Sequence, residues 1–197
     1  MIAAPLPELP LRCCLLSGGA SRRMGRDKAL LPHPEGGCWL ERSLQLLAGL
    51  QAPVTLLSRW PNHLERAKAL ELPQLETITE PAPWEGPLLA LHRLMQQHPE
   101  QRLLLCPVDM PALTRASLQE LLQAGAAEPR AIHLAHDGDR LQPLLGIYPS
   151  TATRRSALAQ AIEQGERRLQ GWLAQQPCRS VRLEATALRN VNRASEL

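Results

Sequence analysis

The feature that most constrains this chain is a short apolar run that ends in two glycines and continues into a basic segment. Residues 15–31 read LLSGGASRRMGRDKALL. The apolar residues 13–16 predict a buried parallel strand, because a strand that is covered on both faces is continuously apolar. Gly18 and Gly19 then allow the backbone conformations and the close approach that phosphate binding by backbone N–H groups requires. This order of strand, glycines and cations predicts an α/β fold with a nucleotide-binding loop.

Three basic side chains, Arg22, Arg23 and Lys28, follow the glycines. Such a combination suits a nucleoside triphosphate, because the cations neutralise the oxygens that the backbone N–H groups hold. Taken alone, a Gly-Gly pair is also a common tight turn, and a group of Arg and Lys is usually a solvated surface. The spacing differs from both GxxxxGK[ST] and GxGxxG, which excludes the common kinase and dehydrogenase loops.

The length and composition favour a single domain of ordinary size. We expect one domain over residues 1–197, with residues 1–10 flexible, because no linker or repeat divides the chain. A net charge of +3, no Phe and one Tyr argue against polymeric nucleic acid as a partner. Five cysteines without a CxxC pair indicate reduced thiols and a cytoplasmic location. No segment has the pattern of a secretory signal or the roughly 18 apolar residues of a membrane span, so no membrane partner is expected.

Segments with strand-like and helix-like patterns alternate along the chain. Such alternation predicts a single-domain, Rossmann-like α/β fold in which helices flank a mostly parallel sheet. Thr114 is a good N-cap for one of the helices. Strands are expected at residues 13–16, 54–57, 75–79, 102–106, 131–135 and 144–148, and helices at 39–50, 87–95, 115–123, 151–164 and 168–175.

One acidic residue, Asp109, follows the strand predicted at residues 102–106, in the segment LLLCPVDMPALT. Ligands of an open parallel sheet bind beyond the carboxyl ends of its strands, so Asp109 and the glycine loop are expected to converge at one edge. An Asp in this position also suits a turn or a helix cap. Opposite a triphosphate, however, the carboxylate is a natural Mg²⁺ ligand, because magnesium is commonly held by one or two carboxylates and substrate phosphates.

A second polar group has the composition of a metal site but the pattern of a turn. His133, His136, Asp137 and Asp139 lie close in sequence around an Asp-Gly pair. Side chains alternate in direction along a strand, and Asp-Gly is typical of a hairpin. We therefore expect a turn here and no metal site.

Three segments of the chain are similar to motifs of the molybdenum cofactor guanylyltransferases of the MobA family. Residues 16–30, LSGGASRRMGRDKAL, resemble the family loop LAGGxSxRMGxDKaL. Residues 86–90, GPLLA, resemble the element GPLaG, and residues 106–111, CPVDMP, resemble C-P-x-D-x-P. Shorter similarities are HDG at 136–138, GERR at 165–168 and NVN at 190–192. The resemblance covers nearly the whole chain beyond the first ten residues and implies a nucleotidyltransferase fold.

The resemblance also implies an activity. The expected enzyme transfers GMP from GTP to the terminal phosphate of molybdopterin or Mo-molybdopterin, with Mg²⁺ as cofactor, and releases pyrophosphate. Molybdoenzyme-maturation proteins are further possible partners. The roles assigned to residues are a nucleotide cradle (Leu16, Ser17, Gly18, Gly19, Gly86), a base or ribose contact (Glu80), phosphate neutralisation and catalysis (Lys28, Arg22, with help from Arg23), Mg²⁺ binding (Asp109) and contact with the pterin-side phosphate (Arg168, Asn192).

This chain departs from the family pattern in two places. Family members place a base-contacting Asn at the end of the second strand, where this chain has Leu56, Leu57 and Ser58. Ala90 replaces the second glycine of the GPLaG element. A cytidylyltransferase acting on molybdopterin and a nucleotidyltransferase acting on a sugar phosphate therefore stay open as alternatives. A non-catalytic carrier of molybdopterin or nucleotide is a third alternative, although it would not need both Lys28 and Asp109.

Overall fold

The computed structural model describes residues 9–19 and 27–191. Within them, one sheet holds the strands in the order β3-β2-β1-β4-β6-β5-β7. The strands are β1 (Leu11–Leu16), β2 (Val54–Ser58), β3 (Leu75–Thr79), β4 (Arg102–Pro107), β5 (Ile132–His136), β6 (Leu141–Pro149) and β7 (Cys178–Arg182). The helices are the short 3-10 helix η1 (Lys28–Leu30), α1 (Trp39–Ala48), α2 (Pro61–Ala69), α3 (Pro87–Gln97), α4 (Arg115–Ala127), α5 (Ala152–Glu163) and α6 (Leu169–Leu173).

The sheet is mostly parallel, as predicted. β1 pairs in parallel with β2 on one side and with β4 on the other, and β2 pairs in parallel with β3. β6 is the exception, because it runs antiparallel to both β4 and β5. The order of strands reverses between β1 and β4, so a crevice is expected beyond the carboxyl ends of these two strands.

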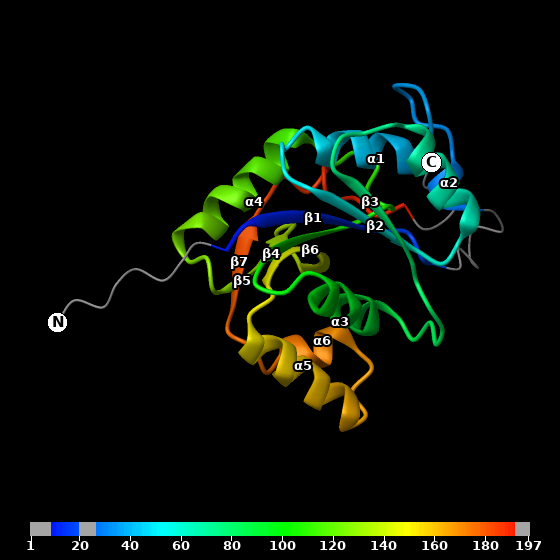
Figure 1. Ribbon diagram of the computed structural model, residues 1–197. Helices are drawn as coiled ribbons and strands as arrows, with labels where there is room; N and C mark the ends of the chain where they lie inside the picture. The colour runs from blue at the N-terminus through cyan, green and yellow to red at the C-terminus, as the bar shows by residue number, and fades with distance from the viewer. Residues whose placement is uncertain (1–8, 20–26, 192–197) are drawn as a thin grey trace.

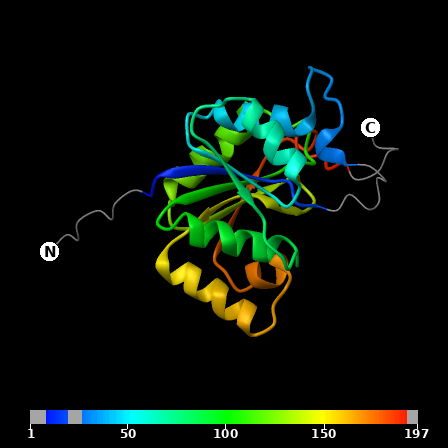
Figure 2. The same ribbon diagram turned by 45° about the vertical axis from the view of Figure 1, so that its right-hand side comes forward.

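Helices cover both faces of the sheet, as Figures 1 and 2 show. α1, α2 and α4 lie on one face, and α3, α5 and α6 lie on the other. The alternation of side chains along β1 serves both layers. Cys13 and Leu15 pack in the core cluster with Leu44 of α1, while Cys14 packs in the opposite cluster with Leu91 of α3. This burial on both faces explains why residues 13–16 of β1 are all apolar.

Local sequence signals set the starts of two helices. The Thr114 hydroxyl accepts a hydrogen bond from the Ser117 backbone N–H at 3.2 Å, which confirms the predicted N-cap of α4. α3 begins with Pro87, whose fixed φ suits the first turn of a helix. Gly86 precedes it with a φ of 98°, a conformation that residues with a Cβ rarely adopt.

Three elements were not predicted from the sequence: the short helix η1, α2 and β7. α2 buries only His63 and Ala67, so it has no apolar stripe that signals a helix. β7 has the sequence CRSVR, in which only Cys178 and Val181 are partly buried, as is common for an edge strand. At the other end of the described chain, Leu9 is buried, and the Pro10 carbonyl accepts a hydrogen bond from the Arg102 N–H at 2.8 Å.

The segment between β5 and β6 is a hairpin turn, as predicted. The Asp137 carboxylate accepts hydrogen bonds from the backbone N–H groups of Asp139 and Arg140, each at 2.9 Å. These bonds lower the pKa of Asp137 to about 2. All five cysteines are free thiols. In the part of the chain that the structure describes, no helix is long and apolar enough to cross a bilayer.

Candidate nucleotide-binding site

A cavity of about 420 Å³ lies beyond the carboxyl ends of β1, β2, β3 and β4. The strand reversal brings the glycine loop after β1 and the acidic loop after β4 to this cavity, as the sequence pattern predicts. Ser17 does not line it, because this side chain is buried beneath the loop. The predicted site residues on the cavity wall are Leu16, Gly18, Gly19, Lys28, Glu80, Gly86 and Asp109.

Lys28 and Asp109 form an ion pair at one part of this wall. Lys28 Nζ lies 2.7 Å from Asp109 Oδ2, and the two side chains are only 15% and 18% exposed. Asp109 Oδ1 is buried and accepts no hydrogen bond from the described residues. A buried carboxylate oxygen without a partner is costly, so it is a good candidate for a metal ion or an incoming donor. Lys28 opens η1, and the Asp27 side chain caps that helix by accepting the Ala29 N–H at 3.0 Å.

The donor set suits magnesium better than zinc. Among residues 9–19 and 27–191, no group of three or more His, Cys, Asp or Glu side chains is arranged to hold a metal. Mg²⁺ often uses one or two carboxylates together with substrate phosphates and water, so a single carboxylate such as Asp109 is sufficient. The buried Oδ1 of Asp109 therefore fits the expected ligand.

Glu80 follows β3 and reaches across to the glycine loop. Its Oε1 accepts a hydrogen bond from Arg93 Nη1 at 3.0 Å. A Cβ placed on Gly18 would lie only 2.4 Å from Glu80 Oε2, so this glycine leaves room for the carboxylate. Burial raises the pKa of Glu80, and the positive charges of Arg93 and Arg59 oppose that shift. The acid predicted to contact the base or ribose thus lies against the nucleotide loop.

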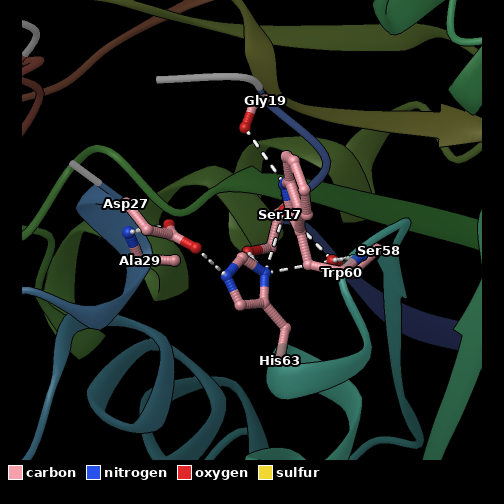
Figure 3. Close-up of polar contacts among 7 residues, drawn as sticks. All are labelled: Ser17, Gly19, Asp27, Ala29, Ser58, Trp60 and His63. Atoms are coloured by element: carbon pink, nitrogen blue, oxygen red, sulfur yellow. Dashed lines mark hydrogen bonds and ion pairs between the residues drawn. The ribbon is translucent and has the colours of Figure 1, made fainter. Parts of the chain in front are cut away.

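A buried imidazole joins the two ends of the glycine loop (Figure 3). His63 of α2 is 1% exposed, and its Nε2 lies 2.6 Å from Asp27 Oδ2. On the other side of the ring, Nδ1 lies 2.8 Å from Ser17 Oγ and 3.0 Å from Ser58 Oγ. An ionised Asp27 only accepts hydrogen bonds, so Nε2 carries a proton. Ser17, Ser58 and Asp27 are therefore tied to one ring.

Arg59 and Trp84 form another part of the wall, and Trp60 adjoins them. The Arg59 Cζ lies over the rings of both Trp60 and Trp84, 4.6 and 4.8 Å from their centroids. Trp60 Nε1 donates a hydrogen bond to the Gly19 carbonyl at 3.3 Å, as Figure 3 shows. Trp84 Nε1 donates to the Glu80 carbonyl at 3.0 Å. The two rings thus connect Arg59 with the glycine loop and with the segment after β3.

The C-terminal segment reaches the acidic loop. The Val191 N–H donates to the Asp109 carbonyl at 3.0 Å, and Asn190 Nδ2 donates to Gln142 Oε1 at 3.2 Å. Arg168 does not line the cavity. It is an exposed residue that forms the N-cap of α6. The remaining predicted site residues, Arg22, Arg23 and Asn192, lie outside the described residues.

Sequence reasoning missed three residues near the predicted site: Arg59, His63 and Arg93. A polar side chain on the buried side of a helix, as in the case of His63, is a usable signal, but only after α2 has been recognised. Arg93 lies on the predicted helix of residues 87–95, and its pairing with Glu80 depends on tertiary structure. Arg59 directly follows a predicted strand, which is itself a signal in a parallel sheet.

The fold and this edge of the sheet define a nucleotidyltransferase-type domain, in which a glycine loop, a lysine and an acid meet at the switch point. The family profile described as "MobA-like NTP transferase domain" matches residues 13–180. The chain therefore belongs to the MobA-like NTP transferase family.

Relatives and solved structures agree with this assignment. A probable molybdenum cofactor guanylyltransferase of Rhodopirellula baltica is 34% identical over 99% of this chain and 92% of its own length. A protein of the same description from Synechococcus elongatus is 35% identical over 81% of both chains. The structure of molybdopterin-guanine dinucleotide biosynthesis protein A from Archaeoglobus fulgidus superposes with a TM-score of 0.72, at 20% identity and 94% coverage of both chains. At that identity the superposition shows the shared fold.

Proposed function

We propose that the protein is a molybdenum cofactor guanylyltransferase, which transfers GMP from GTP to the terminal phosphate of molybdopterin or Mo-molybdopterin. The names of the relatives support this function, and so does the site. The observation that carries the proposal is the Lys28–Asp109 pair beside the glycine loop, with one Asp109 oxygen buried and without a donor among the described residues. A cation and a metal-binding carboxylate at a phosphate loop are what nucleotidyl transfer requires.

The reaction joins two anions. An oxygen of the acceptor phosphate attacks the α-phosphorus of GTP, a new P–O bond forms, and the bond to the β-phosphate breaks with its electron pair leaving on pyrophosphate. Catalysis therefore depends on positioning and charge neutralisation, and no protein nucleophile is needed. The backbone of the loop at Gly18 and Gly19 holds the phosphates, and Lys28 neutralises charge at the reacting group. Glu80 lies where a base or ribose contact is expected.

Mg²⁺ is the proposed cofactor, with Asp109 as its protein ligand. When bound, the ion would neutralise phosphate oxygens and help to align them. Asp109 Oδ2 also accepts a hydrogen bond from Lys28 Nζ, so the same carboxylate orients the lysine. The backbone carbonyl of Asp109 is in turn held by the Val191 N–H, which fixes this loop from the C-terminal side.

The acceptor is proposed to bind on the far side of the Asp109 loop from Glu80. A polar cavity of about 900 Å³ lies there, between the β5–β6 hairpin and the C-terminal segment. Its wall includes the side chains of Arg140, Arg182 and Asn190. Guanidinium groups suit a phosphate, and Asn190 adjoins Val191, which contacts the Asp109 loop. Arg168 and Asn192 remain proposed contacts of the pterin-side phosphate, and Arg22 and Arg23 remain proposed contacts of the triphosphate.

We also propose the partners of the protein and its location in the cell. The substrates are GTP and a pterin phosphate, and the product is suited to transfer to proteins that mature molybdoenzymes. The free thiols agree with a reducing compartment, so we propose a cytoplasmic location. We propose neither nucleic acid nor a membrane as a partner.

Pyrophosphate release tests the function. Purified protein is supplied with Mg²⁺, molybdopterin and either GTP or CTP, and Asp109→Asn is compared with Glu120→Gln, which removes an exposed carboxylate of α4. We expect release with GTP that Asp109→Asn abolishes and Glu120→Gln preserves. A preference for CTP would assign the protein to cytidylyl transfer, and no release with either nucleotide would favour a carrier or another acceptor.

A further inference from the structure

Arg59 occupies a fixed position on the wall of the nucleotide cavity. It lies one residue beyond Ser58, at the end of the strand where the family resemblance leads one to expect an asparagine. Its Cζ lies over the Trp60 ring and over the Trp84 ring, 4.6 and 4.8 Å from the two centroids. Each indole N–H is itself bonded to a backbone carbonyl, of Gly19 and of Glu80 respectively, so both rings are anchored.

The N–H groups of a guanidinium lie in its plane, so Arg59 can form hydrogen bonds only at the edges of this group. The Nε atom of Arg59 is buried and has no hydrogen-bond partner among the described residues. A buried donor without an acceptor destabilises the protein unless a ligand satisfies it. A partner that accepts from two of these N–H groups therefore lies in the guanidinium plane and offers two acceptors side by side. A planar heterocycle with two adjacent acceptors meets that requirement.

The strand order indicates which end of the cavity would hold the nucleotide base, and Arg59 lies at that end. Asp109 follows β4, and Glu80 follows β3, three strand spacings or about 14 Å away across the sheet. This span suits an extended nucleoside triphosphate. Phosphates belong near Lys28 and away from the carboxylate of Glu80, because like charges repel. Arg59 follows β2, the strand beside β3, so it lies on the Glu80 side.

We propose that Arg59 selects the base by donating a pair of hydrogen bonds to O6 and N7 of guanine. This inference rests on the proposed guanylyltransferase function and supplies the recognition that the missing asparagine leaves open. Arginine commonly binds this edge of guanine with two N–H groups, whereas adenine presents an amino donor in place of O6. The N1–H and N2–H₂ donors of guanine complement the acidic Glu80 on the same side of the cavity.

The test measures nucleotide binding by titration calorimetry, using GTP, 7-deaza-GTP, ATP and CTP. 7-Deaza-GTP lacks the N7 acceptor and keeps every other group. Arg59→Lys keeps the charge but loses the planar fork. Arg59→Gln offers an amide that suits adenine N6 and N7. Arg130→Gln, at an exposed arginine outside the cavity, is the matched control. Thermal unfolding of each variant shows whether the fold is retained.

We expect the unchanged protein to bind GTP more tightly than 7-deaza-GTP and ATP. Both Arg59 variants should lose about 5- to 150-fold in GTP affinity, the range for one bidentate base contact, and Arg59→Gln should gain relative affinity for ATP. Arg130→Gln should bind as the unchanged protein does. In the variants, GTP and 7-deaza-GTP should bind alike, because the N7 contact is gone.

Three results would overturn the assignment of Arg59. Full GTP affinity in Arg59→Lys would show that Arg59 contributes its charge alone. An equal loss of affinity for GTP, ATP and CTP in the variants would place Arg59 on the phosphates. Equal affinity of the unchanged protein for 7-deaza-GTP and GTP would exclude the N7 contact. If the proposed function itself were wrong, the unchanged protein would prefer CTP or release no pyrophosphate from GTP. That result differs from each of the three that would overturn only the assignment of Arg59.

Discussion

His63 Nε2 lies 2.6 Å from Asp27 Oδ2, although 36 positions separate the two residues in sequence. The opposite nitrogen of the same ring contacts Ser17 Oγ. Ser17 precedes the two glycines of the loop, and Asp27 directly precedes Lys28. One buried ring therefore fixes the separation between the start of the glycine loop and Lys28, the lysine proposed to neutralise the phosphates.

We expect His63→Ala to lower both stability and turnover. Loss of the ring leaves Ser17 and Ser58 with fewer hydrogen-bond partners in a buried position, which costs about 1–3 kcal/mol in the free energy of unfolding. Lys28 then loses its fixed relation to the loop, so kcat for pyrophosphate release should fall more than KM for GTP rises. Denaturant unfolding and steady-state kinetics measure the two effects. His92→Ala is the control, since His92 Nδ1 is buried and has no hydrogen-bond partner among the described residues. A loss of stability with unchanged kcat would show that His63 serves the fold alone.

Replacing Lys28 by methionine should remove most of the activity. The aliphatic chain is kept, while the ammonium that is proposed to neutralise the reacting phosphates is lost. Removal of one preorganised donor of this kind lowers kcat by about 10²- to 10³-fold. Pyrophosphate release at saturating GTP checks the effect, with Lys68→Met on the exposed side of α2 as the matched control. Equal activity of the two variants would argue against a catalytic role for Lys28.

Gly18→Ala should act on nucleotide binding through Glu80. The new Cβ would lie 2.4 Å from Glu80 Oε2, so the carboxylate has to move. The end of a flexible side chain moves at little cost in stability, but its position toward the nucleotide is lost. We expect KM for GTP to rise while the melting temperature changes little. A double-mutant cycle tests the route: in a Glu80→Ala background, Gly18→Ala should have no further effect. Additive effects in that cycle would show that Gly18 acts independently of Glu80.

Asp137 should contribute to the acid sensitivity of the protein. Its carboxylate has a pKa of about 2 in the folded protein, because two backbone N–H groups donate to it. The ordinary value of an aspartate is about 3.9. The carboxylate therefore stabilises the folded state above about pH 4, and this contribution is lost as the pH falls toward 2. The melting temperature of Asp137→Asn should lie below that of the unchanged protein at pH 6, and the two should converge near pH 2. A difference that stays constant with pH would contradict this account.

The sequence predicts the central layers of the fold well, because their signals are local. Continuous apolar runs mark β1, β2 and β4, and the strand bounds differ from the predicted ones by few residues. The meeting of the glycine loop with Asp109 also follows from the rule for parallel sheets. α2 and β7 escape prediction because neither buries a regular apolar face.

The side-chain partners within the site were not predictable in the same way. Arg59 and Trp84 stack only because β2 and β3 are neighbours, and no spacing in the sequence encodes that contact. His63 reaches Asp27 across an unpredicted helix. Arg168, in contrast, was assigned a site role by resemblance, but it lies on the surface at the start of α6. Contacts between distant segments depend on packing that a single sequence does not reveal.

The reversal of strand order between β1 and β4 distributes the site over separate stretches of the chain. Residues 58–90 supply Arg59, Trp84, Glu80 and Gly86, whereas the Asp109 loop, the β5–β6 hairpin and residues 182–191 lie on the other side. These two groups of residues follow one another in sequence and do not interleave. A chimera that exchanges only residues 58–90 with those of a relative should therefore change the nucleotide that is used and keep the proposed acceptor.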